Sequence, residues 1–207
     1  MIIEVFQDTI CPWCRIGKKH LFEAIARWEG EPIEIRYRAY QLDPHSPKTS
    51  QPFWETMAAN KGGRATVEQM VQHAARAGEA AGIAFHFDKV AVWPNTLASH
   101  TLLKCAPEAR VTEAVDAVYK AYFEDGKDIG DTDVLVAIAE ELGMDGAEVR
   151  QAIETGARQA EIDEDTAFAR ELQITGVPFF VIDRKLALSG AQTPENFLKA
   201  FRQATEG

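Results

Sequence analysis

Basic residues and long apolar runs are both scarce in this sequence. It has 22 Lys and Arg against 32 Asp and Glu, which gives a net charge of −10. This balance argues against a general nucleic-acid-binding protein, which needs a basic patch. No apolar run is long enough to span a membrane, and the start, MIIEVFQDTICPWC, has none of the basic residues of a secretory signal. We therefore expect a cytoplasmic protein.

Cysteine is also scarce, with three residues in 207. A small and odd number of cysteines argues against a disulfide framework. Cys105 stands alone, whereas Cys11 and Cys14 lie three positions apart after an apolar stretch. In a reducing compartment, we expect such a close pair to serve catalysis or metal binding rather than to cross-link the fold.

The first 40 residues have the pattern of a strand, a helix and a second strand. Residues 2–6 form a short apolar run, and 33–39 alternate apolar with polar residues, so both are expected to be strands. Between them, apolar residues recur at helical spacing from 12 to 28. This order suggests a βαβ unit with a parallel pair of strands.

Strand signals return only near the end of the chain. Residues 178–183 and 185–190 are expected to form a hairpin, followed by a helix at 193–204 that Thr193 caps. The stretch from 53 to 174 has helical patterns throughout, after a proline-rich break at 40–52.

Neither group of strands could bury both of its faces alone. We therefore predict one discontinuous α/β domain, residues 1–42 and 175–207, with a large all-helical insertion at 43–174 between its βαβ and ββα halves. Within the insertion, Thr66 with Gln69 has the spacing of a capping box, and Asn95 is placed to cap the next helix.

The cysteine pair falls where the first strand meets the first helix. Pro12 suits the first helical turn because its missing N–H would have no partner there. The free N–H groups and the helix dipole favour a thiolate at Cys11, the form that attacks disulfides. Cys14 lies on the same face but is set back into the turn. We expect Cys11 to be the nucleophile and Cys14 to resolve the mixed disulfide.

Two other interpretations of this pair remain open but are weaker. A structural disulfide does not fit the reducing compartment. A metal site needs two further ligands, and the five histidines (20, 45, 73, 86 and 100) contain no pair at ligand spacing. A C-x-x-C motif beside a βαβ pattern favours redox chemistry without a metal.

A second feature lies in the stretch ITGVPFFVID, residues 174–183. Val177-Pro178 opens a strand that the expected topology places beside the first one. Proline has no N–H to donate to a neighbouring strand, so its presence at this point indicates a special turn. A cis bond would put the backbone of Val177 beside Cys11, but an ordinary trans proline at a strand start is compatible with the sequence too.

These residues together resemble a known family. CPWC after the first strand, a helical insertion and TGVPFFVID near the end are similar to the DsbA-like branch of the thioredoxin superfamily. The stretches AYQLDP, WPNTLASH and DIGDTDVL resemble, more narrowly, its FrnE-like subfamily. That subfamily is related to 2-hydroxychromene-2-carboxylate isomerases and kappa-class glutathione transferases. The resemblance extends over essentially the whole chain and implies a thioredoxin-like fold.

The resemblance implies that Pro178 is cis and that Cys11, Cys14, Val177 and Pro178 form the exchange site, with Pro12 in support. The isomerase and transferase relatives generally carry serine at the first cysteine position and use it to position glutathione. The presence of both cysteines here favours disulfide exchange. Some FrnE-like proteins have a second redox pair near the C-terminus, but no cysteine follows Cys105 in this chain.

Several further residues are candidates for the site. Trp13, between the cysteines, is expected to be partly exposed and to tune the thiolate, while Trp54 and Trp93 either line an apolar groove or belong to the core. Asp8 is a candidate proton acceptor or a strand-end charge. We also consider substrate contact for Asp8, Trp93, Asn95 and His100, although capping a helix is at least as good a role for Asn95. Cys105 is expected to be a small buried apolar residue, with a regulatory thiol as the alternative.

The function expected from the sequence is thiol–disulfide exchange with proteins or small thiols, glutathione included as a co-substrate. It needs no metal, nucleotide or other cofactor beyond the Cys11–Cys14 pair. A glutathione-dependent isomerase or transferase of aromatic substrates is the first alternative. A non-catalytic redox-sensing or holdase module is the second. The sequence does not indicate the oligomeric state.

Overall fold

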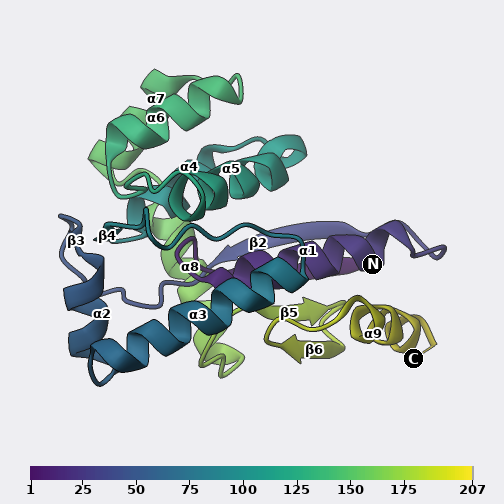
Figure 1. Cartoon of the computed structure of the whole chain (residues 1–207). Coiled ribbons are helices and arrows are strands. Elements are labelled where there is room, and N and C mark those ends of the chain that lie inside the picture. The colour runs from purple at the N-terminus through teal and green to yellow at the C-terminus, as the bar shows by residue number, and fades with distance from the viewer. Residues whose placement is uncertain (207) are drawn as a thin grey trace.

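The computed structural model describes residues 1–206, in which a four-stranded sheet forms the centre (Figure 1). β1 pairs with β2 in parallel and with β5 in antiparallel orientation, and β5 forms a hairpin with the edge strand β6. The strand order is β2-β1-β5-β6. The strands are β1 (Ile2–Gln7), β2 (Glu34–Ala39), β5 (Phe179–Ile182) and β6 (Leu186–Ser189).

Helices cover both faces of this sheet. α1 (Pro12–Ala26) and α9 (Pro194–Glu206) pack against one face, where Ile3 and Val5 of β1 point. Phe6 alternates to the other face and packs with Ala169 of α8 (Gln159–Glu171). Period-two alternation along β1 therefore distributes its apolar side chains between two separate cores.

The segment between β2 and β5 contains most of the helices, and we call it the helical segment. It includes α8 and the short 3₁₀ turn Glu108–Arg110. Its other helices are α2 (Phe53–Lys61), α3 (Arg64–Ala80), α4 (Leu97–Cys105), α5 (Val111–Phe123), α6 (Thr132–Glu141) and α7 (Gly146–Thr155). Figure 1 shows α3 running beside α1, while α6 and α7 lie farther from the sheet.

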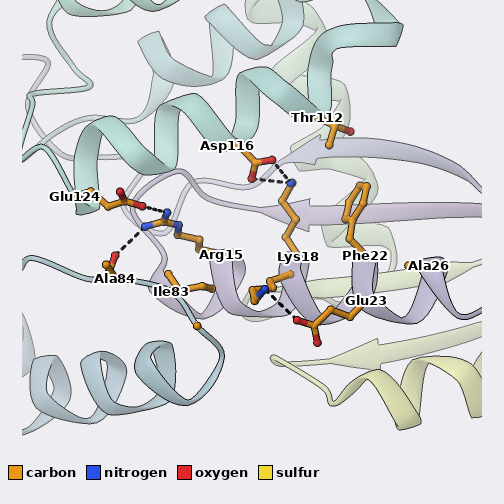
Figure 2. A pocket seen from close by; sticks show the side chains of 12 residues that line it. Arg15, Lys18, Phe22, Glu23, Ala26, Ile83, Ala84, Thr112, Asp116 and Glu124 are labelled. Carbon is orange, nitrogen blue, oxygen red and sulfur yellow. Dashed lines mark hydrogen bonds and ion pairs between the residues drawn. The ribbon is translucent and has the colours of Figure 1, made fainter.

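Ion pairs connect α1 to the helical segment (Figure 2). Lys18 Nζ lies 2.7 Å from both carboxylate oxygens of Asp116 on α5, and Arg15 pairs with Glu124. Burial lowers the pKa of Lys18, while Asp116 opposes that shift. A hollow of about 550 Å³ opens here between α1, α5 and residues 82–84. Each of its three cations, Lys19 included, is paired with a carboxylate, so the hollow has no free charge to offer a ligand.

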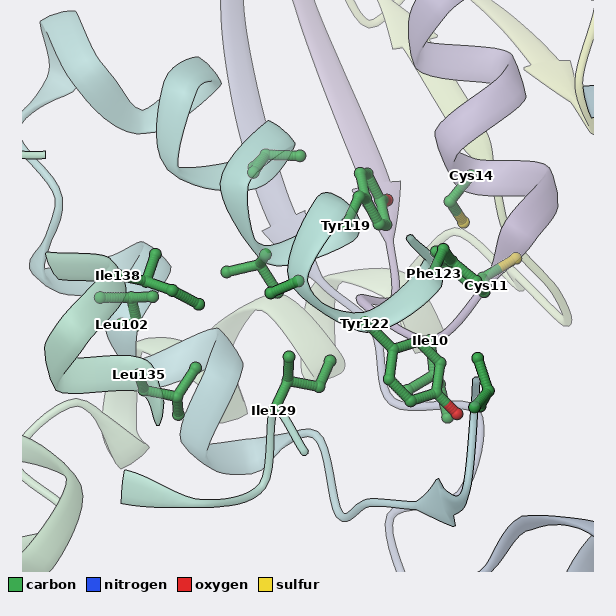
Figure 3. Packing of buried hydrophobic residues seen from close by; sticks show 14 of the residues in the cluster. Ile10, Cys11, Cys14, Leu102, Tyr119, Tyr122, Phe123, Ile129, Leu135 and Ile138 are labelled. Carbon is green, nitrogen blue, oxygen red and sulfur yellow. The ribbon is translucent and has the colours of Figure 1, made fainter. Parts of the chain in front are cut away.

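Aromatic side chains of α5 join the helical segment to the cysteines (Figure 3). Tyr119, Tyr122 and Phe123 are each about 1% exposed and belong to the same core as Cys11 and Cys14. This core continues away from the sheet to Leu102, Leu135 and Ile138. The active-site end of α1 is therefore packed into the helical segment, whereas its later turns pack on α9 and the sheet.

The predicted fold is confirmed: a thioredoxin-like α/β sheet, a parallel β1–β2 pair, a β5–β6 hairpin and a large helical insertion. The insertion is not wholly helical, because Gln51–Pro52 (β3) pairs with Val92–Trp93 (β4). A ladder of two residues has no periodicity that a sequence could show. Within residues 1–206, no helix is both long and apolar enough to cross a membrane.

The domain boundaries at 42/43 and 174/175 stay a prediction, and Gly207 lies outside the described residues.

The prediction of a capping box at Thr66 is wrong. Helix α3 begins earlier, at Arg64, after Gly62 and Gly63 with φ of 82° and 108°. Two glycines with positive φ stop α2 and allow the next helix to start at once. The predicted cap at Thr193 is confirmed, since its hydroxyl accepts a hydrogen bond from the N–H of Asn196 at 3.3 Å.

Gly17 sets how closely α1 approaches the loop before β5. A Cβ atom at this position would lie 3.0 Å from Cγ of Pro178 and 3.1 Å from Cζ of Phe180. Such contacts are tighter than ordinary packing, so a larger side chain must displace the loop that faces the cysteines.

We predict that Gly17→Leu destabilises the protein by about 1–3 kcal/mol, because overpacking forces α1 away from Pro178. Urea unfolding gives the free energy of unfolding directly. Lys19→Leu, two positions along and 39% exposed, places the same side chain where there is room and should change stability by no more than about 0.5 kcal/mol. Equal losses in the two variants would contradict this role of Gly17.

Candidate active site

Cys11 lies at the junction of β1 and α1. Its backbone is extended, with φ −92° and ψ 110°, and Pro12 is the first helical residue. The carbonyl of Cys11 accepts hydrogen bonds from the N–H groups of Cys14 at 3.1 Å and Arg15 at 3.4 Å. The thiol therefore stands at the start of the helix, where free N–H groups stabilise a negative charge.

The loop before β5 faces this thiol. Sγ of Cys11 lies 3.6 Å from the carbonyl oxygen of Val177 and donates to it. The Val177–Pro178 peptide bond is cis, as the resemblance implies. Cys11, Cys14, Val177 and Pro178 are thus brought together from the two ends of the chain. Their roles in exchange stay a prediction.

The two cysteines are free and buried. Cys11 is 3% exposed and Cys14 is 2% exposed. The pKa of Cys14 is raised well above its usual value, chiefly by burial and further by the hydrogen bond and charge of Cys11. Cys14 therefore carries its proton at neutral pH and must lose it before it can attack a disulfide.

Asp8 lies behind the cysteines rather than at the surface. Its side chain is fully buried, and Oδ2 accepts the N–H of Leu42 at 2.7 Å. Oδ1 lies 3.3 Å from Nε2 of His100, which is 1% exposed. The structure thus places Asp8 and His100 together, on the inner side of the site.

Asn95 has a structural role. Its side chain accepts the N–H of Leu97 at 3.0 Å, at the start of α4, and donates to the carbonyl of Ser46 at 2.7 Å. Gln41 also donates to it, at 3.2 Å. The N-cap position of α4 is Thr96 rather than the predicted Asn95, which accepts the first N–H of the helix from one residue earlier. These bonds occupy the polar groups of Asn95 that a substrate would use. Substrate contact by Asp8, Trp93, Asn95 and His100 stays a prediction.

An apolar pocket of about 280 Å³ opens beside Cys11. Trp13 and Trp93 line it, and Trp93 also belongs to the buried core, so both of its expected roles apply. Trp13 is half-buried, with its ring centroid 5.0 Å from that of His73. Trp54 is not among the lining residues and packs edge-on against Phe53 instead. Most of the pocket wall is apolar, so it suits a nonpolar group adjacent to a disulfide.

Most residues that line this apolar pocket could not be identified from the sequence. Residues on α2, α3 and the loop before β4 complete it, among them Met57, Val71, Ala74 and Phe87. Their helical spacing predicts only that they face inward. No local signal separates a residue that lines a pocket from one that fills a core, because the difference depends on distant elements.

Cys105 is half-buried, at the end of α4. Its pKa is raised by burial, which the guanidinium of Arg158 opposes. The residue thus packs as an apolar side chain against the helical segment. Within residues 1–206, no group of three or more His, Cys, Asp or Glu side chains is arranged to hold a metal ion.

Comparison with known proteins agrees with this geometry. The family model for the DSBA-like thioredoxin domain matches residues 2–202. The uncharacterized protein YwbO of Bacillus subtilis (strain 168) is 29% identical over 208 residues, covering 96% of this chain and 94% of YwbO.

Solved structures share the fold over the full length. A probable DsbA oxidoreductase of Streptomyces coelicolor has a TM-score of 0.91 and 32% identity, covering all of this chain and 90% of its own. The cytosolic disulfide reductase DsbM of Pseudomonas aeruginosa, solved with GSH, has a TM-score of 0.72, 17% identity and full coverage of both chains. A 2-hydroxychromene-2-carboxylate isomerase has a TM-score of 0.71 and 17% identity, covering all of this chain and 95% of its own.

We predict that Cys14 alkylates slowly at neutral pH and that its rate keeps rising above pH 9. Burial is the largest cause of its raised pKa, so the effect persists when Cys11 is replaced. Mass spectrometry of iodoacetamide adducts against pH, in a Cys11→Ser, Cys105→Ala protein, measures this thiol alone. A rate that levels off below about pH 8.5, the value of a free cysteine, would contradict the assignment.

Proposed function

The chain belongs to the DSBA-like thioredoxin domain family, and we propose that it is a thiol–disulfide oxidoreductase acting through Cys11 and Cys14. The observation that supports this most strongly is the position of Cys11. Its sulfur stands at the start of α1, faces the carbonyl of Val177 and has Cys14 behind it. This arrangement offers one sulfur to a disulfide and keeps a second within reach.

The reduced enzyme exchanges its dithiol for a disulfide of the substrate. The thiolate of Cys11 attacks one substrate sulfur, which forms a mixed disulfide and releases the other substrate sulfur as a thiolate. Cys14 then loses its proton and attacks Cys11, which releases the second substrate thiolate. The enzyme ends oxidised by two electrons and the substrate reduced by two. The same steps in reverse oxidise a dithiol.

The apolar pocket favours peptide or protein disulfides with a nonpolar side chain near the cysteine. At about 280 Å³ it lies just below the roughly 300–1,000 Å³ range of small-molecule sites. An extended chain can also pair with the backbone of half-buried Val177. Glutathione remains a candidate co-substrate, supported by the DsbM structure with GSH, and the cytosolic location of DsbM also supports a cytoplasmic location for this chain.

A glutathione-dependent isomerase is the second candidate, favoured by the shared isomerase fold and the apolar pocket beside Cys11. It requires a bound glutathione and turnover of an aromatic substrate without net redox change. A redox sensor, the third candidate, would exchange slowly with model disulfides and change conformation or oligomeric state when oxidised.

We predict that the wild-type protein catalyses insulin reduction with dithiothreitol and that Cys11→Ser abolishes the catalysis. The hydroxyl of serine has no accessible anion at neutral pH, so the nucleophile is lost. When reduced Cys14→Ser is mixed with insulin in the absence of dithiothreitol, a mixed disulfide between Cys11 and insulin accumulates, because the site has no second thiol to resolve it. Insulin turbidity and intact mass spectrometry measure these two outcomes.

Cys105→Ala serves as the matched control, since it removes a thiol outside the site, and it should retain wild-type rates. If Cys11→Ser equals the wild type, the oxidoreductase proposal fails. A glutathione adduct on Cys11 that persists in the wild type, with isomerisation of 2-hydroxychromene-2-carboxylate, would instead favour the isomerase.

We predict that Val71→Arg raises the KM for a peptide disulfide with a neighbouring aromatic residue by about tenfold. Burying one apolar side chain contributes about 1.5–3 kcal/mol, and 1.4 kcal/mol corresponds to a factor of ten. Steady-state kinetics with the peptide measures this change. The exposed neighbour Gln72 lies on the same helix outside the pocket, so Gln72→Arg should leave KM unchanged.

The same variants should reduce oxidised glutathione at equal rates, because this substrate has no apolar side chain to bury. A KM for the aromatic peptide that is equal in Val71→Arg and wild type would remove the pocket from the substrate site.

A further inference from the structure

The apolar pocket beside Cys11 has an aromatic wall on the side of the helical segment. Phe87 and Phe123 both line the pocket, and their ring centroids lie 5.9 Å apart at an angle of 74°. Phe85 packs against both rings, with its centroid 5.5 Å from that of Phe87 and 5.0 Å from that of Phe123, yet it does not line the pocket. Phe85 therefore supports the two rings that a substrate side chain would meet.

Two of these three rings belong to a segment without helix or strand, residues 81–91 between α3 and β4. The N–H of His86 donates to the carbonyl of Phe123 at 2.7 Å, which fixes the middle of this segment. Irregular segments are more mobile than the elements that they connect. The position of the Phe85 ring therefore depends on the side chains that contact it.

Phe85 lies between α3 and α1. On α3, Gly78 leaves the space for it, because a Cβ atom at this position would overlap Cδ2 of the Phe85 ring. On the side of α1, the guanidinium carbon of Arg15 lies 5.6 Å from the centroid of the ring. A cation over an aromatic ring is attracted by the negative face of the ring. The ring is thus held between a glycine that admits it and an arginine that attracts it.

Arg15 also binds the backbone of the segment 81–91 and the end of α5 (Figure 2). Nη1 donates to the carbonyl of Ala84 at 3.1 Å, and Nη2 pairs with the carboxylate of Glu124. The side chain of Arg15 is 15% exposed, so these bonds are partly shielded from water. The planar fork of a guanidinium suits two acceptors at once, which the ammonium of lysine does not match. One side chain therefore joins α1, the segment 81–91 and α5.

The turn that places the thiols also places this arginine, because Arg15 comes directly after Cys14. Its N–H donates to the carbonyl of Cys11 at 3.4 Å. Arg15 is therefore bonded to the backbone of the active site at one end and contacts Phe85 at the other. The position of the aromatic wall relative to Cys11 thus depends on the first turn of α1.

We propose that Arg15 determines specificity: it holds Phe85, and through it Phe87 and Phe123, where they bind an aromatic side chain next to the substrate disulfide. This role rests on the proposed oxidoreductase function and adds to it the side chain that the pocket prefers. Arg15 is a positioning residue, since it acts through Phe85 and does not line the pocket.

The wall favours an aromatic side chain for a geometric reason. Aromatic pairs prefer offset-stacked or edge-to-face arrangements, which are worth about twofold to tenfold in an equilibrium constant beyond the burial of their area. A ring that enters the pocket can adopt this geometry on Phe87 or Phe123 only while both keep their positions. A methyl group gains nothing from the angle of the rings, so loss of the support should affect an aromatic substrate more than a small one.

The test uses two disulfide peptides that differ in one residue beside the cysteine, either phenylalanine or alanine. Steady-state kinetics of their reduction gives the selectivity, defined as kcat/KM for the phenylalanine peptide divided by kcat/KM for the alanine peptide. In Arg15→Met we expect the selectivity to fall about threefold to tenfold. The loss should appear as a higher KM for the phenylalanine peptide rather than a lower kcat, because both thiols are still present.

Lys18→Met is the matched control, because it also removes an ion pair between α1 and α5. Its partner Asp116 lies outside both the segment 81–91 and the apolar pocket, and is 61% exposed, so no charge is left buried. The selectivity of Lys18→Met should equal that of the wild type. An equal loss in the two variants would mean that Arg15 merely fastens α1 to α5.

Arg15→Lys separates the geometry of the guanidinium from its charge. It keeps a cation near Glu124 and the thiols but loses the fork that also binds the carbonyl of Ala84. We expect the selectivity to fall in this variant too. If the charge beside Cys11 were what matters, Arg15→Lys would keep the selectivity of the wild type.

Phe85→Leu reaches the same wall without removing a charge, and it keeps the proposal testable if circular dichroism shows that Arg15→Met does not fold. It should lower the selectivity about as far as Arg15→Met. The double variant should fall no further than either single one, because both changes act on one chain of contacts.

The proposal is overturned if Arg15→Met or Arg15→Lys keeps the selectivity of the wild type, if Lys18→Met loses as much, or if the losses in Arg15→Met and Phe85→Leu simply add. A wild type that reduces both peptides equally well would refute the aromatic preference and leave the oxidoreductase function in place. A wild type that reduces neither peptide would instead refute the oxidoreductase function.

Discussion

The structure depends on satisfying the polar residues at the end of β1. Gln7, Asp8 and Thr9 are buried behind the cysteines, and each unsatisfied group there would cost about 1–3 kcal/mol. A domain is stable by only about 5–15 kcal/mol, so three such losses, about 3–9 kcal/mol together, would remove a large part of its stability. The side chains that satisfy them come from α4 and α5. The sheet and the helical segment therefore form a single structure.

A second buried network joins the same parts farther from the cysteines. Asp165 on α8 is 1% exposed, accepts the N–H of Ala39 at 2.8 Å and forms ion pairs with Arg38 and Lys104. Arg38 also pairs with the buried Glu4 of β1. Breaking such a network by removing one partner costs about 3–5 kcal/mol, because a charge is left buried and alone. Strands β1 and β2 are thus fixed against α4 and α8, which positions α4 for its contact with Asp8.

Local patterns predicted the parts of the fold whose determinants lie close together in sequence. The strand that ends before Cys11, the helix that begins at Pro12 and the β5–β6 hairpin all follow from periodicity and turn chemistry. The partners of the buried residues could not be predicted this way. Thr9 and Ser99 are 90 residues apart and Asp8 and His100 are 92 apart. Such pairs become visible only once the helical segment folds back on β1.

The two sides of the dithiol have opposite chemistry, which fits the different roles that we propose for its two thiols. Cys11 lies at the apolar pocket, where a substrate excludes water and gains from burial of its side chains. Cys14 lies near the buried polar residues at the end of β1, and burial raises its pKa and keeps its thiol protonated. A neutral thiol is a poor nucleophile and does not attack early, but it must lose its proton before it can attack the mixed disulfide. An apolar environment on both sides would protect Cys14 and leave it inert, so the polar inner side favours the resolving role that we propose for this cysteine.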